Sequence, residues 1–270
     1  MEHSKAEVAQ FWNRASCGEE LLLNAADREG YAEQSRRRYE LEPFILGFAN
    51  FGEGSGKRVL EIGVGLGADH EQWAQSGAEL FGVDLTQRAI DHVCTRLAVF
   101  GLRSTLAVGD AERLTFPDHS FDIVYSWGVL HHTPNTPQAF KEVLRVLRPN
   151  GTARIMIYSK WSIIGLMLWV RYALLKLRPW WSLKRVYAEY LESPGTKAYT
   201  IREARGLMEG FVDVKIHTVL THGDLLASGA GQRHASPLLS AARVVWPRGL
   251  IQALLPGRGL FMLIEGRKPA

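Results

Sequence analysis

The sequence predicts an α/β protein in which a mostly parallel β-sheet is covered by helices on both faces. From residue 58 to residue 158, short aliphatic runs alternate with helical segments, which is typical of βαβ units. Two further runs, 212–218 and 260–264, lie close together without an obvious helical crossover, which favours an antiparallel edge. Of the 270 residues 46% are hydrophobic, enough for a sizeable core.

The elements follow in a regular order along the chain. Strands are expected at 58–62, 80–84, 104–108, 121–126 and 152–158. Helices are expected at 5–16, 31–50, 70–75, 86–100, 137–147 and 201–208. Residues 148–151, Arg-Pro-Asn-Gly, predict a turn between the helix at 137–147 and the next strand.

Composition narrows the classes of function. A net charge of +4 and a pI of about 9.1 permit an anionic substrate or a membrane surface, but they do not require nucleic acid. No motif for binding nucleic acid is present. Cys17 and Cys94 lie far apart in unlike contexts, which argues against a disulfide framework and favours the cytoplasm. The N-terminus lacks the apolar core of a signal peptide.

One apolar run raises the question of a membrane. Residues 163–170 are apolar, but Arg171 and Lys176 interrupt the run before the ~20 residues that a spanning helix needs. Basic and aromatic residues continue to about position 187. The pattern favours a buried or interfacial amphipathic helix, and peripheral contact with a membrane remains open.

The stretch Val59–Gly67, VLEIGVGLG, combines a strand with a glycine-rich turn and the start of a helix. Gly63, Gly65 and Gly67 allow the backbone to approach a ligand closely. The spacing also fits the dinucleotide pattern G-x-G-x-x-G/A, so the turn alone leaves the ligand open. A phosphate-binding P-loop is disfavoured because the turn has no lysine.

Three acidic residues stand where a nucleoside could meet them. Glu61 lies two positions before the first glycine. Asp84 ends the second strand and could accept hydrogen bonds from ribose hydroxyls, a feature shared with folds that bind NAD. Asp110 follows the third strand and could accept a hydrogen bond from an adenine amino group.

The motifs VLEIGVGLG, GVDLT, GDAERLTF, FDIVYSWGVLHH and LRPNG together resemble the class I S-adenosylmethionine-dependent methyltransferases with a type 11/25-like domain. They occur in the order and spacing of that family over residues 56–158. The resemblance implies a Rossmann-like three-layer sandwich, a seven-stranded sheet with one antiparallel edge strand, and helical insertions. We expect an N-terminal helical lid at 1–54, a core at 55–158, 201–220 and 258–268, and cap insertions at 159–200 and 221–257.

The resemblance also implies S-adenosylmethionine as donor and S-adenosylhomocysteine as product. Carried over residue by residue, the donor contacts are Glu61, Gly63, Gly65, Gly67, Asp84, Leu85, Asp110, Ala111, Ser126 and Trp127.

Methyl transfer from a sulfonium needs alignment and exclusion of water, and a neutral acceptor must also lose a proton. His131, His132 and Tyr158 are therefore candidate catalytic residues at the ends of the fourth and fifth strands. A structural role for the histidines in their turn is an open alternative. A metal is not expected, because adjacent side chains point to different faces and no further ligands stand at a suitable spacing.

Candidate acceptor contacts lie in the segments outside the core, where ordinary loop or core roles compete with a role in binding. They are Arg38, Tyr39, Trp161, Lys197, Tyr199, His222 and Arg233. The sequence predicts a small-molecule methyltransferase. Two alternatives stay open, a methyltransferase of a lipid or quinone-like acceptor at a membrane surface and a non-catalytic S-adenosylmethionine-binding protein.

Overall fold

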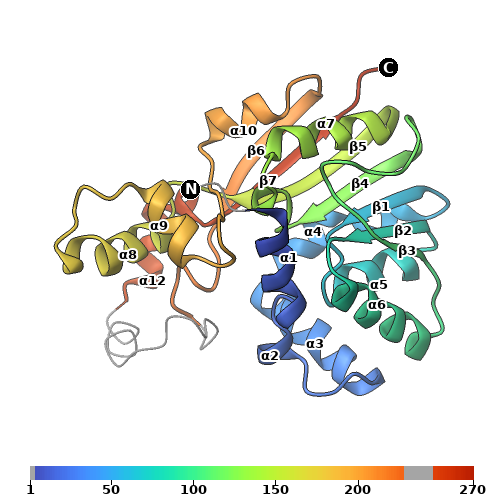
Figure 1. The fold of residues 1–270 in the computed structure, drawn as a ribbon, viewed down its shortest axis with the longest axis horizontal. Helices are drawn as coiled ribbons and strands as arrows, with labels where there is room; N and C mark the ends of the chain where they lie inside the picture. The colour runs from blue at the N-terminus through green and yellow to red at the C-terminus, as the bar shows by residue number, and fades with distance from the viewer. Residues whose placement is uncertain (1–3, 228–245) are drawn as a thin grey trace.

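A computed structural model describes residues 4–227 and 246–270. Within these residues, seven strands form one sheet in the order β3-β2-β1-β4-β5-β7-β6 (Figure 1). The strands are β1 (Arg58–Ile62), β2 (Glu79–Asp84), β3 (Thr105–Val108), β4 (Phe121–Trp127), β5 (Leu147–Tyr158), β6 (Val212–Val219) and β7 (Phe261–Arg267). The five strands from β1 to β5 pair in parallel, and β7 runs antiparallel to both of its neighbours. The predicted fold class is confirmed, with β7 inserted between β5 and the outermost strand β6.

The prediction of a turn at 148–151 is wrong, because β5 begins at Leu147 and continues through these residues. Leu147 pairs with Phe121, whereas Thr152 pairs with Ile123, so the register shifts between the two pairs. Asn150 within this irregularity has a φ of 64°. The turn-forming residues thus make a bulge inside the strand.

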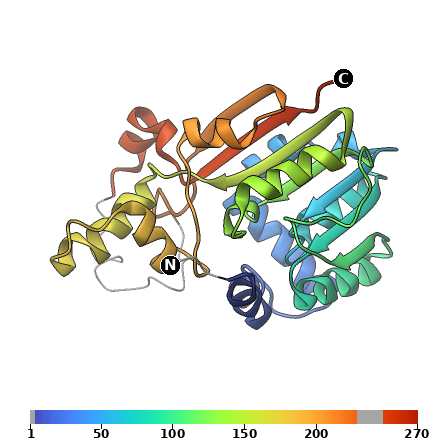
Figure 2. The ribbon, with the colours of Figure 1, turned by 45° about the horizontal axis from the view of Figure 1, so that its top comes forward.

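Helices cover both faces of the sheet (Figure 2). On one face lie α3 (Arg28–Leu41), α4 (Phe44–Ala49), α5 (Ala68–Gln75) and α6 (Gln87–Phe100). On the other face lie α7 (Thr136–Val146) and α10 (Ile201–Leu207), whose apolar side chains pack with the strands in the largest core cluster. Phe140 and Val143 of α7 and Ile155 of β5 belong to this cluster and are almost completely buried. The result is a three-layer sandwich.

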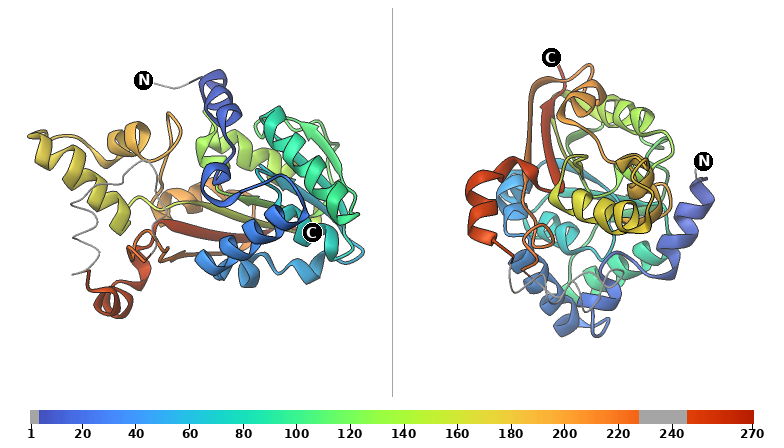
Figure 3. Two further views of the ribbon diagram at one scale, coloured as in Figure 1. Left: turned by 90° about the horizontal axis from the view of Figure 1, so that it is seen from below. Right: turned by 90° about the vertical axis from the view of Figure 1, so that its left-hand side faces the viewer.

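The remaining helices stand at one end of the sheet. They are α1 (Lys5–Arg14), α2 (Glu19–Leu22), α8 (Ile163–Tyr172), α9 (Leu183–Tyr190) and α12 (Arg248–Leu254). Helices α8 and α9 pack on each other beyond the C-terminal end of β5, and α1 lies between them and α6 (Figures 1 and 3). None of the helices in the described part of the chain is long and apolar enough to cross a membrane.

Candidate active site

A cavity of about 1170 Å³ opens at the C-terminal ends of β1, β2 and β4, the edge at which open α/β folds bind ligands. Its volume exceeds the usual range for one small ligand, so it can hold two reactants. One part is lined by the glycine-rich turn and the acidic strand ends, and the other by α8 and the cap. We call these parts the donor half and the acceptor half.

The three glycines of the turn serve different purposes, although each has a positive φ. A Cβ atom on Gly63 would lie 2.0 Å from Val129, and one on Gly67 would lie 2.9 Å from Val93. These two positions therefore need glycine for packing. A Cβ atom on Gly65 would meet nothing within 4 Å, although Gly65 lines the cavity. The space beside Gly65 is the cradle that a closely bound ligand would fill.

Asp84 lies at the end of β2 with both carboxylate oxygens engaged by the backbone around it. Its Oδ1 accepts hydrogen bonds from the Thr86 amide at 2.9 Å and the Thr86 hydroxyl at 2.8 Å. Its Oδ2 accepts from the Gly65 amide at 3.3 Å. Burial raises the pKa of Asp84 against these bonds. Because a carboxylate oxygen accepts more than one bond, Oδ2 can still receive a ribose hydroxyl.

Asp110 ties the N-terminal helix to the loop after β3. Lys5 of α1 donates to Asp110 Oδ2 at 2.6 Å and lies 2.6 Å from Glu112 Oε2. Asp110, Leu85 and the buried Ala111 all line the donor half. The lysine therefore closes α1 over the part of the cavity that these residues form.

Glu61 is buried at the end of β1 and lines the cavity. Its Oε2 lies 2.8 Å from His70 Nδ1, and His70 Nε2 lies 2.8 Å from the Ser104 hydroxyl. Ser104 donates its proton to the Leu80 carbonyl, so His70 Nε2 must donate to Ser104 and Nδ1 is left to accept. Burial and the nearby Asp69 raise the pKa of Glu61 well above its ordinary value, which fits a proton shared with Nδ1.

Arg38 of α3 reaches the cavity through a buried network centred on Asp69. It donates to both carboxylate oxygens of Asp69, at 3.1 and 2.8 Å, and the hydroxyls of Tyr39 and Tyr125 donate to the same carboxylate. Tyr39 does not line the cavity, so its contact is with Asp69. Arg38 Nη1 also lies 3.6 Å from Glu42, a cavity residue whose pKa burial raises to about 7.

The two neighbouring residues at the end of β4 differ in their surroundings. Trp127 lines the cavity and stacks on Phe44 with ring centroids 6.1 Å apart. Ser126 is fully buried, and its hydroxyl donates to the Ile62 carbonyl at 2.9 Å. The expectation that Ser126 reaches the donor is therefore wrong, because alternate residues of a strand face opposite sides of the sheet.

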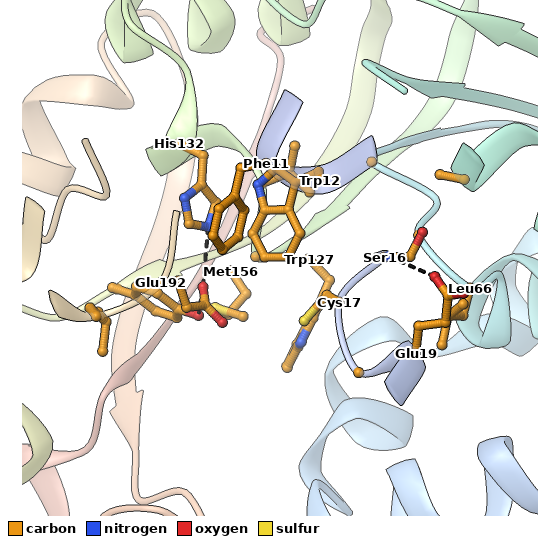
Figure 4. A pocket seen from close by; sticks show the side chains of 18 of the residues that line it. Phe11, Trp12, Ser16, Cys17, Glu19, Leu66, Trp127, His132, Met156 and Glu192 are labelled. Atoms are coloured by element: carbon orange, nitrogen blue, oxygen red, sulfur yellow. Dashed lines mark hydrogen bonds and ion pairs between the residues drawn. The ribbon is translucent and has the colours of Figure 1, made fainter. Parts of the chain in front are cut away.

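In the acceptor half, three polar side chains meet, and Figure 4 shows two of them, His132 and Glu192, facing each other. His132 Nε2 lies 3.4 Å from Glu192 Oε2, and the Tyr158 hydroxyl donates to the same oxygen at 2.7 Å. His132 Nδ1 lies 2.8 Å from the Ser193 hydroxyl, within the cap. Burial and the Glu192 carboxylate raise the pKa of Tyr158 well above its ordinary value, so Tyr158 remains a donor. We call His132, Tyr158 and Glu192 the polar cluster.

His131 differs from its neighbour. It is fully buried and does not line the cavity, and among the described residues neither ring nitrogen has a hydrogen-bond partner. Its ring centroid lies 4.1 Å from those of His132 and Tyr158. Burial lowers the pKa of His131 well below its ordinary value, so the ring is neutral. Its placement favours the structural alternative, because a base must reach the acceptor.

The histidines nevertheless converge more closely than adjacent residues of a strand would. Ligand atoms of His131, His132 and Glu192 lie within 4.8 Å of one another, so these three side chains could hold a metal ion. The cause is local: His131 and His132 lie in the 3-10 turn η2 (Leu130–His132), where successive side chains do not alternate between two faces.

Of the predicted acceptor contacts, Arg38 and His222 line the cavity. Trp161, Lys197 and Tyr199 do not. The exposed fraction of Trp161 is 55%, and the Lys197 ammonium donates to the carbonyls of Thr133 and Pro134 at 2.7 and 2.6 Å. Arg233 lies outside the described residues.

Several cavity residues were missed by the sequence reasoning. Glu192 stands 60 positions from His132, and no local pattern connects the two. Phe11 and Trp12 of α1 also line the cavity, and the Trp12 ring lies edge-on to His132 with centroids 5.6 Å apart (Figure 4). The feature of the sequence that could have identified them is the pair of adjacent aromatic residues in the N-terminal helix.

Comparisons with known proteins agree with this geometry. The family model described as "Methyltransferase domain" matches residues 60–155. The 2-methyl-6-phytyl-1,4-hydroquinone methyltransferase of Synechocystis sp. is 30% identical over 177 residues, 62% of this chain and 51% of that protein. Phosphoethanolamine N-methyltransferase 1 of Zea mays is 31% identical over 106 residues, 39% of this chain and 21% of that protein. The chain thus spans about half the length of the first relative and about a fifth of the second.

Among solved structures, phosphoethanolamine N-methyltransferase 2 of Haemonchus contortus, in complex with phosphomonomethylethanolamine and S-adenosylhomocysteine, is similar with a TM-score of 0.62. It is 18% identical, and the match covers 97% of this chain and 60% of that chain, a likeness that shows the fold. The sequence match and the fold coincide over β1 to β5. Residues 60–155 match the methyltransferase domain, which agrees with the family that the motifs resemble.

Proposed function

We propose that this protein is an S-adenosylmethionine-dependent methyltransferase that acts on an apolar small molecule. The observation that carries the proposal is the convergence of the glycine turn and the acids of three strand ends on one cavity with an apolar second half. When bound, S-adenosylmethionine supplies an activated methyl group on a sulfonium, and S-adenosylhomocysteine is the product.

The donor half offers a contact for each part of the donor. Asp84 would accept hydrogen bonds from the ribose hydroxyls, and Gly65 gives the backbone room to approach the ligand. Asp110 and Ala111 line the cavity beside it, and Asp110 would accept a hydrogen bond from the adenine amino group. Glu61 and Arg38 line the same cavity and would hold the amino-acid part, since a carboxyl group and a guanidinium complement an ammonium and a carboxylate.

The polar cluster provides the proton chemistry. An acceptor O–H or N–H that attacks a methyl group must release its proton, and a side chain that takes this proton must lie within reach of the acceptor. Glu192 is the group that receives this proton, since Tyr158 holds its own and donates to Glu192. His132 lies beside the same oxygen and stabilises the carboxylate until the proton arrives.

The lining of the acceptor half favours an apolar acceptor over a charged one such as phosphoethanolamine. Beside the polar cluster, Arg171, Thr221 and His222, it is built mainly from aliphatic and aromatic side chains: Phe11, Trp12, Ile164, Met167, Leu168, Val170, Leu175, Leu191, Leu226, Trp246, Leu260 and Phe261. Apolar walls with a few polar groups suit a hydroxyl compound with a large hydrocarbon part. This supports the second candidate, a lipid or quinone-like acceptor taken at a membrane surface.

The test is calorimetric titration of S-adenosylhomocysteine into the wild type and Asp84→Ala. Saturable binding by the wild type, with at least about tenfold weaker binding by the variant, is expected from the loss of a charged hydrogen-bond acceptor. Equal affinity of the two proteins contradicts the donor site. Turnover with hydroquinones of increasing chain length then distinguishes an enzyme from a protein that only binds the donor.

A further inference from the structure

The turn that follows α8 carries large apolar side chains in solvent. We define the tip surface as the exposed residues of η3 (Leu174–Lys176) and the turn after it, namely Leu174, Leu175, Lys176, Leu177, Arg178 and Trp180. The exposed fractions of Leu177 and Trp180 reach 82% and 75%. Together with α8, this segment forms the left-hand extremity of the molecule in Figure 1.

The charge around the tip surface is of one sign. Between positions 160 and 188 the chain has six basic residues and no acidic residue. Lys176 and Arg178 lie within the tip surface itself, and the Arg178 guanidinium stands 4.8 Å from the Trp181 ring centroid. Leucine and tryptophan among lysine and arginine are the composition of segments that enter the interface of an anionic bilayer.

The backbone conformation at Leu177 also favours contact of this residue with a membrane. Leu177 has a φ of 56°, in the left-handed region that leucine rarely adopts. Asparagine or glycine would suit this backbone better and would also leave less apolar surface in water. In the isolated protein, leucine at this position is unfavourable both for its backbone conformation and for its exposed apolar side chain. Burial of the side chain in lipid would offset these costs.

The tip surface is also continuous with the cavity. Leu175 belongs to the tip surface and lines the acceptor half, as do Met167, Val170 and Arg171 of α8. An apolar molecule that leaves a bilayer at the tip surface therefore meets aliphatic side chains along its path. The path ends in the half of the cavity that holds the polar cluster.

We infer that the tip surface docks on an anionic lipid bilayer and that the acceptor enters the cavity from the lipid past Leu175, which belongs to both. The docking stands on the exposed residues and their charge alone, whereas the route of the acceptor rests on the proposed function.

The test is sedimentation of the full chain with phosphatidylcholine vesicles and with vesicles that also contain an equal share of phosphatidylglycerol. We expect binding to the anionic vesicles that weakens as salt is raised, with a blue shift of tryptophan emission. Lys176→Glu should weaken binding at least about fivefold, because each basic residue near the surface contributes about that factor. Leu177→Asn and Trp180→Ala should each weaken it by about tenfold or more.

Two controls keep the inference open to contradiction. Asparagine tolerates the positive φ at position 177, so a loss of binding by Leu177→Asn cannot come from unfolding. Ile201→Asp removes an exposed apolar side chain from α10, away from the tip surface. Failure of the wild type to sediment, or equal weakening by Ile201→Asp, overturns the docking. A wild type that elutes as a dimer and becomes monomeric on Leu177→Asn assigns the surface to a second copy and also overturns it. S-adenosylhomocysteine affinity without vesicles tests the proposed function separately.

Discussion

Glu192 of the cap accepts a hydrogen bond of 2.7 Å from Tyr158, the last residue of β5. This bond joins the segment after β5 to the C-terminal end of that strand, just beyond the matched residues 60–155. It also fixes a carboxylate beside His132 within the acceptor half. The proton chemistry that we propose for the site therefore depends on the cap as much as on the sheet.

Glu192→Gln should lower kcat by about 100-fold or more and leave the affinity for S-adenosylhomocysteine unchanged, because the amide keeps the shape but cannot take a proton. Tyr158→Phe is the companion variant. It removes the donor to Glu192 but not the base, so a smaller loss of kcat is expected. Steady-state kinetics with calorimetry of both variants measures the split. Full activity of Glu192→Gln would falsify the role of this carboxylate.

Gly65→Ala should reduce the free energy of S-adenosylhomocysteine binding by more than it reduces the free energy of unfolding. The Cβ atom meets no protein atom within 4 Å, so the cost in the free protein is the positive φ, about 1–2 kcal/mol. In the complex, the same atom lies in the space that the ligand needs. Gly206→Ala in α10 is the matched control, since that position is also open but helical, and alanine there should stabilise by about 0.5–1 kcal/mol. Urea unfolding and calorimetry distinguish the two effects. A loss of affinity no larger than the loss of stability contradicts the cradle.

Glu42→Gln should change how stability depends on pH. Burial raises the pKa of Glu42 from 4.5 to about 7 in the folded protein. Between these values the folded state binds more protons than the unfolded chain, so the contribution of Glu42 to stability falls as pH rises and becomes constant above about 7. The variant has no such proton. The stability of the wild type relative to Glu42→Gln should therefore decrease from pH 4.5 to 7, as measured by urea midpoints. A constant difference across this window rules out the shift.

Lys5→Ala should speed the release of S-adenosylhomocysteine by roughly fivefold, because the ion pairs of Lys5 hold α1 against Asp110 and Glu112 and pairs of this exposure contribute up to about 1 kcal/mol. Lys141→Ala removes an exposed lysine from α7 and serves as the control. Stopped-flow displacement gives both rates. Identical rates for the two variants would show that α1 does not retain the donor.

The donor half could be predicted because its chemistry is encoded locally. A strand, a glycine turn and a helix N-terminus follow one another at Glu61 to Gly67, and Asp84 ends the next strand. Hydrophobic alternation and parallel order then bring these strand ends to one edge of the sheet. Ser126 lies one position before the cavity residue Trp127 in β4, and neighbouring residues of a strand face opposite sides of the sheet.

The acceptor half could not be predicted in the same way, because its contacts join distant segments. Glu192 meets His132 and Tyr158 only through the packing of the cap on β5. Lys197, a neighbour of Glu192 in sequence, is turned instead onto the carbonyls of Thr133 and Pro134. No periodicity distinguishes the two residues, and the fold of the cap decides between them.

The position of the cap in the chain has a consequence for how such proteins diversify. Most of the proposed donor contacts fall within residues 60–155, whereas the apolar walls and Glu192 come from segments on either side of this stretch. Recombination or drift in those segments can therefore replace the acceptor without disturbing the use of the donor. A chimera that joins this domain to the flanking segments of a relative should inherit the acceptor preference of that relative. Acceptor specificity would then evolve in the flanking segments and not in the shared domain.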